Sequence, residues 1–126
     1  DAKLRKDDHI AVWGTGKASR GFLYVEDAAD GIIMATERYN KQDPVNLGSD
    51  FEISIKDLVH LISQLTDFKG KIIWDKTKPD GQPRRKLEVS RAKKEFGFVA
   101  KTPFDVGLRK EIEWYEKSIL GKAKIL

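Results

Sequence analysis

The chain has 126 residues, a length that fits one domain with a hydrophobic core of its own. Hydrophobic residues make up 40% and charged residues 35%, a balance that excludes a disordered chain and favours a soluble globular one. The absence of cysteine excludes a disulfide framework and thiolate chemistry, and the formal net charge of +4 favours anionic partners of any kind.

Several further features narrow the class of protein. No apolar run is long enough to span a membrane, so we expect no membrane partner. The first residues lack the apolar core of a signal peptide and include no methionine, which predicts a cytoplasmic chain that starts within a longer protein. The cations are scattered among 20 acids and form no long basic run; we expect no nucleic-acid partner, but the charge alone is compatible with nucleic acid and with a nucleotide diphosphate.

The first part of the chain predicts a helix end, a strand and a loop. Residues 1–7 are typical of the last turns of a helix, and Ile10 to Val12 of a short strand. A loop with glycines and cations follows, and Phe22 to Val25 is predicted to return as a β-strand.

A helix from about Glu26 to Tyr39 and a short strand from Val45 to Leu47 are predicted next, the strand ending at Gly48. The helical spacing of apolar residues predicts one buried stripe, which consists of Ala28, Ile32, Ala35 and Tyr39.

The middle of the chain predicts a capped helix and a second strand. Ser54 is the expected N-cap, with Asp57 three residues later, and the helix runs to about Thr66. A strand over 71–74 follows. The residues predicted to face inward from the helix are Ile55, Leu58, Val59, Ile62 and Leu65.

The last part begins with a polar loop over 75–86. Ser90 is predicted to cap a short helix that ends at Gly97, and Thr102 to cap a long one. We expect residues 121–126 to be frayed, and the whole chain to form one compact α/β unit. The predicted inward stripe of the long helix is Phe104, Leu108, Ile112, Tyr115 and Ile119.

The loop over 13–20 is the strongest candidate for a binding site. Its glycines allow the backbone to approach an anion closely, and Arg20 supplies a planar group that matches phosphate. Taken alone, the same residues also fit an ordinary turn with solvated cations.

Two motifs resemble those of a known family. The run Trp-Gly-x-Gly-x-x-x-Arg-x-Phe-Leu-x-Val-x-Asp over 13–27 resembles the extended short-chain dehydrogenase/reductases that act on nucleotide sugars, the NAD-dependent epimerase/dehydratase family. The run Lys-Pro-Asp-Gly-Gln-Pro-Arg-Arg-Lys over 78–86 resembles a second signature of that family, although Lys86 stands where an apolar residue is common. The combination most resembles the GDP-L-fucose synthase group, over roughly residues 2–118.

The resemblance implies an α/β fold, namely the small mixed substrate-binding domain of such an enzyme without its Rossmann domain. Residues 1–126 would be the C-terminal nucleotide-sugar-binding part of an NADPH-dependent epimerase/reductase that makes GDP-L-fucose from GDP-4-keto-6-deoxy-mannose. NADP would be bound by an N-terminal domain outside this chain, and the full-length enzyme would be a homodimer. The resemblance also implies substrate contacts by Trp13, Arg20 and Asp80, with Arg84 as a second candidate for the diphosphate.

The residues for catalysis are not found in this chain. Gly14, Gly16 and Gly21 do not have the spacing of a dinucleotide-binding turn. Each of the three tyrosines lacks the lysine four residues later that the family uses for proton transfer, so we expect the chain alone to be inactive. His9 and His60 are too far apart in sequence to suggest a metal site.

Other interpretations stay open from the sequence. The chain could belong to another nucleotide-sugar epimerase or dehydratase that acts on UDP- or dTDP-sugars. It could also be a stand-alone module that binds a nucleotide sugar or nucleic acid without catalysis. For Trp13, the alternative to ligand contact is a role as a core anchor.

Overall fold

The computed structural model describes residues 1–121 and divides into two compact units, each built from separate segments of the chain. Unit 1 comprises Asp1–Arg20 and Glu52–Lys86, and unit 2 comprises Gly21–Phe51 and the chain from Leu87 onward. The prediction of one compact unit is therefore wrong, because contacts concentrate within two groups that sequence order does not separate. The mixed α/β character of the fold is confirmed.

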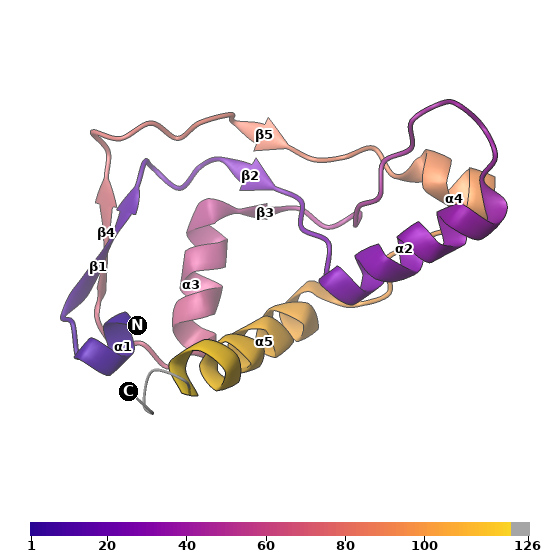
Figure 1. Ribbon diagram of the computed structural model, residues 1–126. Coiled ribbons are helices and arrows are strands. Elements are labelled where there is room, and N and C mark those ends of the chain that lie inside the picture. The colour runs from indigo at the N-terminus through magenta and orange to yellow at the C-terminus, as the bar shows by residue number, and fades with distance from the viewer. Residues whose placement is uncertain (122–126) are drawn as a thin grey trace. The chain divides into compact units, whose positions relative to one another are not determined.

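Unit 1 contains a two-stranded parallel sheet. Its strands are β1, His9–Trp13, and β4, Lys71–Asp75, which pair in register from His9↔Lys71 to Trp13↔Asp75 (Figure 1). Side chains alternate between exposed and partly buried along β1, as expected for a sheet with one covered face. The strands predicted over 10–12 and 71–74 are both confirmed. A short helix, α1 at Ala2–Arg5, precedes β1.

The capped helix of unit 1 also forms where predicted. It is α3, Ile55–Leu65, and the Ser54 hydroxyl accepts a hydrogen bond of 3.0 Å from the Asp57 backbone N–H. This bond satisfies one of the backbone donors that every helix start leaves free. Most of the predicted inward stripe is partly buried, but Ile62 lies at its margin with 36% of its surface exposed.

A second sheet of unit 1 has three very short strands. These are β2, Ser19–Arg20, β3, Ile53–Ser54, and β5, Arg84–Arg85, in the order β3-β2-β5. The strand predicted over 22–25 is wrong: pairing is limited to Ser19–Arg20, and helix α2 begins at Val25. Ser49 donates its hydroxyl to the carbonyl of Phe22 at 2.5 Å, which replaces a strand partner there.

Unit 2 is built around α2, Val25–Arg38, which agrees with the predicted helix to within one residue. Its buried side centres on Gly31, where a β-carbon would lie 2.9 Å from the Phe98 ring and 3.1 Å from Leu47. The predicted stripe is partly wrong, because Ile32 is 60% exposed. The small residue Gly31, and not a large apolar one, sets the contact side of this helix.

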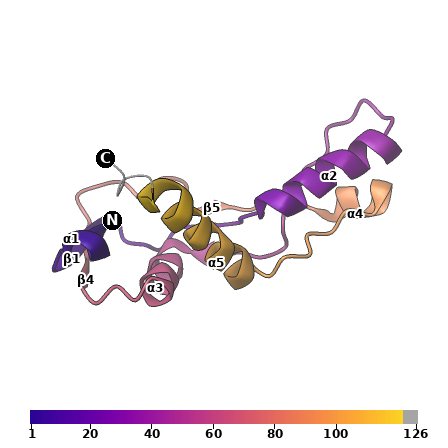
Figure 2. The same cartoon turned by 60° about the horizontal axis from the view of Figure 1, so that its bottom comes forward.

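The core of unit 2 consists of Ala92, Phe96 and Phe98, each no more than 4% exposed. Two of these residues come from α4, Ser90–Phe96, which lies alongside α2 (Figures 1 and 2). The predicted strand over 45–47 does not form, because no described strand runs beside it, and Leu47 instead packs toward Gly31. Gly97 ends α4 in a left-handed conformation with φ of 78°, as predicted.

Two predicted caps are wrong. Ser90 is the first residue of α4, and its backbone N–H is satisfied by the Glu88 carboxylate at 2.7 Å. Thr102 precedes Pro103, the N-cap of α5, and donates its backbone N–H and hydroxyl to Asp27 at 2.9 and 3.1 Å. In all three hydrogen bonds a carboxylate accepts from a residue near a helix start, and in none of them does Ser90 or Thr102 act as the predicted cap.

The last helix is α5, Phe104–Tyr115, followed by the π-helical segment η1, Glu116–Leu120. Of its predicted inward stripe, Tyr115 is 38% exposed, while the first three residues are partly buried. The side chain of Ile119 and the predicted frayed residues 122–126 lie outside the described structure; Gly121 keeps a helical backbone. No helix within residues 1–121 combines the length and hydropathy needed to cross a membrane.

Candidate functional site

The two loops with the predicted site residues both belong to unit 1. Loop 13–20 follows β1, and loop 79–85 follows β4, the parallel neighbour of β1. Because parallel neighbours end at the same edge of a sheet, both loops start from one edge. Hydrogen bonds join them, so the prediction that these distant segments meet is confirmed.

Asp80 fastens the tip of the first loop. Its carboxylate accepts hydrogen bonds from the Thr15 backbone N–H at 2.5 Å and from the Thr15 hydroxyl at 2.7 Å. These donors lower the pKa of Asp80, since they favour its charged form. A β-carbon at Gly14, whose φ is 83°, would lie 2.2 Å from the Asp80 carboxylate. Only glycine fits at position 14. Through its bonds to Thr15, Asp80 holds this loop in place.

Gly16 has a similar packing role. Its φ is 75°, and a β-carbon there would lie 2.7 Å from the Trp74 ring. The Gly16 carbonyl also accepts a hydrogen bond from the Lys56 backbone N–H at 2.9 Å. Gly14 and Gly16 are thus used for close packing within unit 1.

Arg20 is held in place from one side. One terminal nitrogen, Nη1, donates to the Ser19 carbonyl at 2.6 Å and to the Gln82 carbonyl at 2.8 Å. Among the described residues, no partner is found for its Nε and Nη2 groups. Arg20 is partly buried, and its bond to Gln82 orients the guanidinium. The other N–H groups of the guanidinium can still donate to an anion.

Trp13 is 68% exposed, which excludes the alternative role of core anchor within the described chain. The Lys78 ammonium lies 5.6 Å from the centre of the indole ring, within the range of a cation–π contact. This contact joins the end of β1 to the start of the second loop and leaves much of the indole surface open.

Arg84 forms an ion pair and is less available than Arg20. Its guanidinium donates through Nε and Nη2 to Glu52, each at 2.8 Å. The Arg84 bonds, followed by a bond from Ser19, lower the pKa of Glu52 to about 2. Arg84 therefore has a neutralising partner on the sheet that carries it, although its remaining N–H groups can still donate.

Arg85 is a cation that the sequence argument did not single out. In the parallel pairing of β2 with β5, Arg20 is in register with Arg85, and Ser19 with Arg84. Because side chains alternate along a strand, Arg20 and Arg85 share one face of the sheet, and Ser19 and Arg84 share the other. The three consecutive cations over 84–86 indicate positive charge in this loop. The two-residue strand pairing that places Arg85 beside Arg20 is too short to predict from the sequence.

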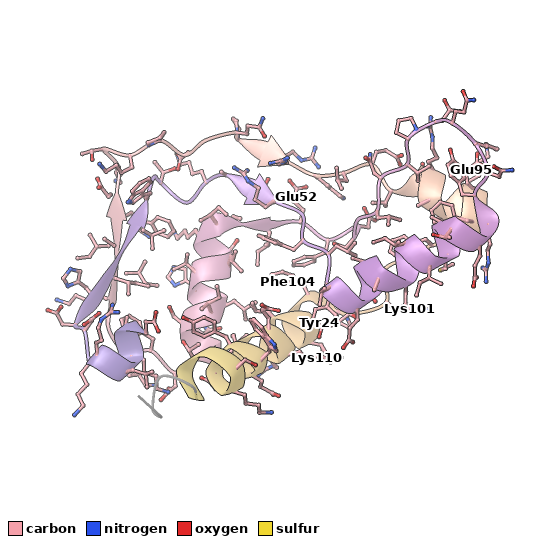
Figure 3. All side chains as sticks on the ribbon, viewed as in Figure 1. Tyr24, Glu52, Glu95, Lys101, Phe104 and Lys110 are labelled. Carbon is pink, nitrogen blue, oxygen red and sulfur yellow. The ribbon has the colours of Figure 1, made fainter. Side chains whose placement is uncertain are left out.

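Unit 2 contains a pocket of about 250 Å³ that the sequence argument missed. Aromatic rings form much of it: Phe51 stacks on Phe104 with centres 4.7 Å apart, and Phe22 lies 5.7 Å from Phe104. Tyr24 lies against Gly107 of α5, and the Lys110 ammonium lies over the Tyr24 ring (Figure 3). The residues that line this pocket include no lysine or arginine, so the pocket lacks the cations that a diphosphate needs.

Metal chemistry has no support among residues 1–121, where no group of three or more potential ligands could hold an ion. The side chains of His9 and His60 are both exposed. His9 Nδ1 lies 2.6 Å from the carboxylate of its neighbour Asp8.

Comparison with known proteins gives a consistent result. The model of the NAD dependent epimerase/dehydratase family matches residues 2–48. A probable GDP-L-fucose synthase 1 of Oryza sativa subsp. japonica is 37% identical over 98% of this chain and 38% of its own length. A putative GDP-L-fucose synthase 2 of Arabidopsis thaliana is 38% identical over 97% of this chain and 37% of its own length.

A solved structure agrees with these relatives. The GDP-L-fucose synthetase of Naegleria fowleri bound to NADP is 26% identical, with a TM-score of 0.84, over 92% of this chain and 36% of that one. This chain thus spans well under half the length of the proteins that it matches. By sequence and by fold, the chain belongs to the NAD dependent epimerase/dehydratase family.

Proposed function

We propose that this chain is the nucleotide-sugar-binding portion of a GDP-L-fucose synthase-like epimerase/reductase. The observation that carries the proposal is the junction of the two loops, which fixes Arg20 by the Gln82 carbonyl and leaves part of its guanidinium free. Relatives named as GDP-L-fucose synthases support the choice of a GDP-sugar over UDP- and dTDP-sugars.

Each proposed contact has a chemical reason. Arg20 would bind the diphosphate through its free N–H groups, and Arg84 would add a second contact through those that Glu52 does not use. Trp13 offers an apolar face and one N–H donor to the nucleotide sugar. Asp80 would accept from a sugar hydroxyl or a guanine N–H with lone pairs that Thr15 leaves free, in addition to holding the loop.

Arg85 strengthens the same site. It lies in register with Arg20 on one face of the sheet, so an anion bound by Arg20 would also experience the positive charge of Arg85. No acidic residue in the register of these three strands faces the two arginines, since the third position on that face is Ile53.

The reaction of the full-length protein would convert GDP-4-keto-6-deoxy-mannose to GDP-L-fucose with NADPH. Gly14 and Gly16, the glycines that most nearly suggest a dinucleotide-binding turn, pack against Asp80 and Trp74. NADP would therefore be bound outside this chain, in a cytoplasmic enzyme that forms a homodimer. This chain's part would be to bind and orient the nucleotide sugar.

The surface of α2 fits a chain that is part of a larger protein. Val25, Ile32 and Ile33 are 57–66% exposed and lie near one another on this helix, away from the side centred on Gly31. A cluster of large exposed apolar residues is unusual for a complete soluble monomer. A further part of the protein would cover it.

Nucleotide titration of the 126-residue chain tests the proposal. Calorimetry should show saturable binding of GDP, and weaker binding of UDP and dTDP. The chain should not oxidise NADPH in the presence of the GDP-keto-sugar. Tighter binding of UDP or dTDP would favour another epimerase or dehydratase. Turnover of NADPH would contradict the assignment of catalysis to a missing part, and binding of none of the nucleotides would contradict the site.

A further inference from the structure

The side chain of Glu52 connects all three strands of the β3-β2-β5 sheet. Glu52 directly precedes β3 and accepts a hydrogen bond of 2.5 Å from the hydroxyl of Ser19 in β2. It also accepts two bonds of 2.8 Å from Arg84 in β5. One carboxylate thus reaches from an edge strand across the middle strand to the opposite edge.

The sheet depends on such a connection because its strands are short. Each has two residues, so the backbone ladder provides few hydrogen bonds to fix the register. The additional backbone bonds near it, such as Ser19 N–H to the Pro83 carbonyl at 2.9 Å, lie at the strand ends. Charge-assisted hydrogen bonds are stronger than neutral ones, so the bonds from Arg84 to Glu52 form a strong side-chain link to β5.

The two faces of the sheet differ in charge. Ser19, Arg84 and Glu52 meet on one face, where the Glu52 carboxylate neutralises Arg84. Arg20 and Arg85 are in register on the other face. Glu52 therefore offsets part of the positive charge on the face that carries Arg84. It also holds the backbone that aligns Arg20 and Arg85 on the other face.

We propose that Glu52 is a positioning residue for the diphosphate site: it does not touch the ligand, but fixes β2 to β5 and so holds Arg20 beside Arg85. This inference rests on the proposed function for the identity of the ligand. It adds a residue that neither family motif contains, since Glu52 lies between the two.

A role for Glu52 in holding the strands and a role through its negative charge alone predict opposite changes in GDP affinity for Glu52→Gln. Glutamine has the same shape but no negative charge, so the protein becomes more positive near the site. If Glu52 acted only through its field, GDP would bind more tightly to the variant. If Glu52 positions the strands, GDP should bind about tenfold more weakly, since groups in one network couple by amounts of this order.

The experiment measures GDP binding by calorimetry for the wild type, Glu52→Gln, Ser19→Ala and the matched control Glu37→Gln. Glu37 is an exposed residue of α2, which belongs to unit 2, whereas the three strands belong to unit 1. Ser19→Ala removes the link from β3 to β2 but keeps the Arg84 ion pair, so it should weaken GDP binding less than Glu52→Gln does. Glu37→Gln should bind GDP like the wild type.

Amide hydrogen exchange provides a readout that needs no ligand. Glu52→Gln should accelerate exchange at residues 19–20 and 84–85 while the amides of α2 and α4 keep their protection. If the wild type does not bind GDP, the proposed function fails, and the exchange data still decide the role of Glu52. Equal or tighter GDP binding by the Glu52→Gln variant, or unchanged exchange at these strands, would overturn the positioning role. If Glu52→Gln does not fold, Ser19→Ala decides by the same two measurements.

Discussion

The two units of this chain are stabilised in different ways. Unit 2 has an aromatic core in which Phe96 and Phe98 are at most 4% exposed, and the Phe96 ring lies 5.6 Å from that of Tyr39. In unit 1, the only buried apolar side chain among the described residues is Ala18, which is 3% exposed. Its loops are joined by hydrogen bonds and ion pairs around Asp80 and Glu52.

The difference fits the function that we propose for unit 1. Apolar packing gives stability without exposing groups for recognition, as in unit 2. The proposed diphosphate site needs exposed cations on a fixed backbone, and in unit 1 polar contacts between loops would hold that backbone. Such contacts contribute less to stability than a core does, so we expect mutations in the two units to affect different properties.

The largest expected effect is in the core of unit 2. Phe96→Ala removes a buried ring and should lower the free energy of unfolding by about 3–5 kcal/mol, measured by urea denaturation. The matched control in unit 1 is Ile73→Ala, which should cost much less because Ile73 is 47% exposed. Similar losses in the two variants would contradict the contrast between the units.

The next effect concerns function in unit 1. In the full-length protein, Arg20→Ala should raise the KM for the GDP-keto-sugar about ten- to a hundredfold, equivalent to roughly 1.5–3 kcal/mol, by loss of a charge-assisted contact. The affinity for NADPH should stay nearly unchanged. The control Arg38→Ala removes an exposed arginine from α2 in unit 2 and should leave KM unchanged. An unchanged KM in Arg20→Ala would mean that Arg20 is only a solvated loop cation.

Local sequence patterns predicted the elements whose causes are local. The Ser54 cap, the Gly97 helix end and the three main helices all depend on residues within one or two turns of each other. The meeting of the two loops was predicted from the family motifs and not from local pattern. It is confirmed by the bonds between Thr15 and Asp80.

The errors of the sequence argument lie where distant partners decide. Thr102 is a residue type that often caps a helix. Instead, its backbone N–H and hydroxyl donate to Asp27, which is far away in sequence. Ile32 fits a helical stripe, but contacts at Gly31 set the buried side. The hydrogen bonds of Glu52 to Ser19 and Arg84 were not predicted, because the strands that bring these residues together are too short to show an alternating pattern.

A smaller effect concerns the cap of α3 in unit 1. Ser54→Ala should lower the free energy of unfolding by about 1 kcal/mol, because the Asp57 backbone N–H loses its acceptor. Ser54→Thr keeps a hydroxyl at the N-cap and should recover most of the loss. If Ser54→Ala leaves the free energy of unfolding unchanged, the cap contributes nothing, and unit 1 depends on its loop contacts alone.

The smallest expected effect is the pH dependence of the Glu52–Arg84 pair. The folded-state pKa of Glu52 is about 2, below its ordinary value of 4.5, because Arg84 and Ser19 stabilise the carboxylate. A lowered pKa means that the pair's stabilisation is complete above the ordinary value and is lost as the pH falls from about 4.5 toward 2. The effect is small because Arg84 is 67% exposed and solvent screens the pair. Urea denaturation of the wild type and Glu52→Gln should give stabilities that converge over this pH range, and Arg84→Gln should remove most of the difference at neutral pH. A difference that stays constant down to the acid end would mean that it does not arise from the ionised Glu52 carboxylate.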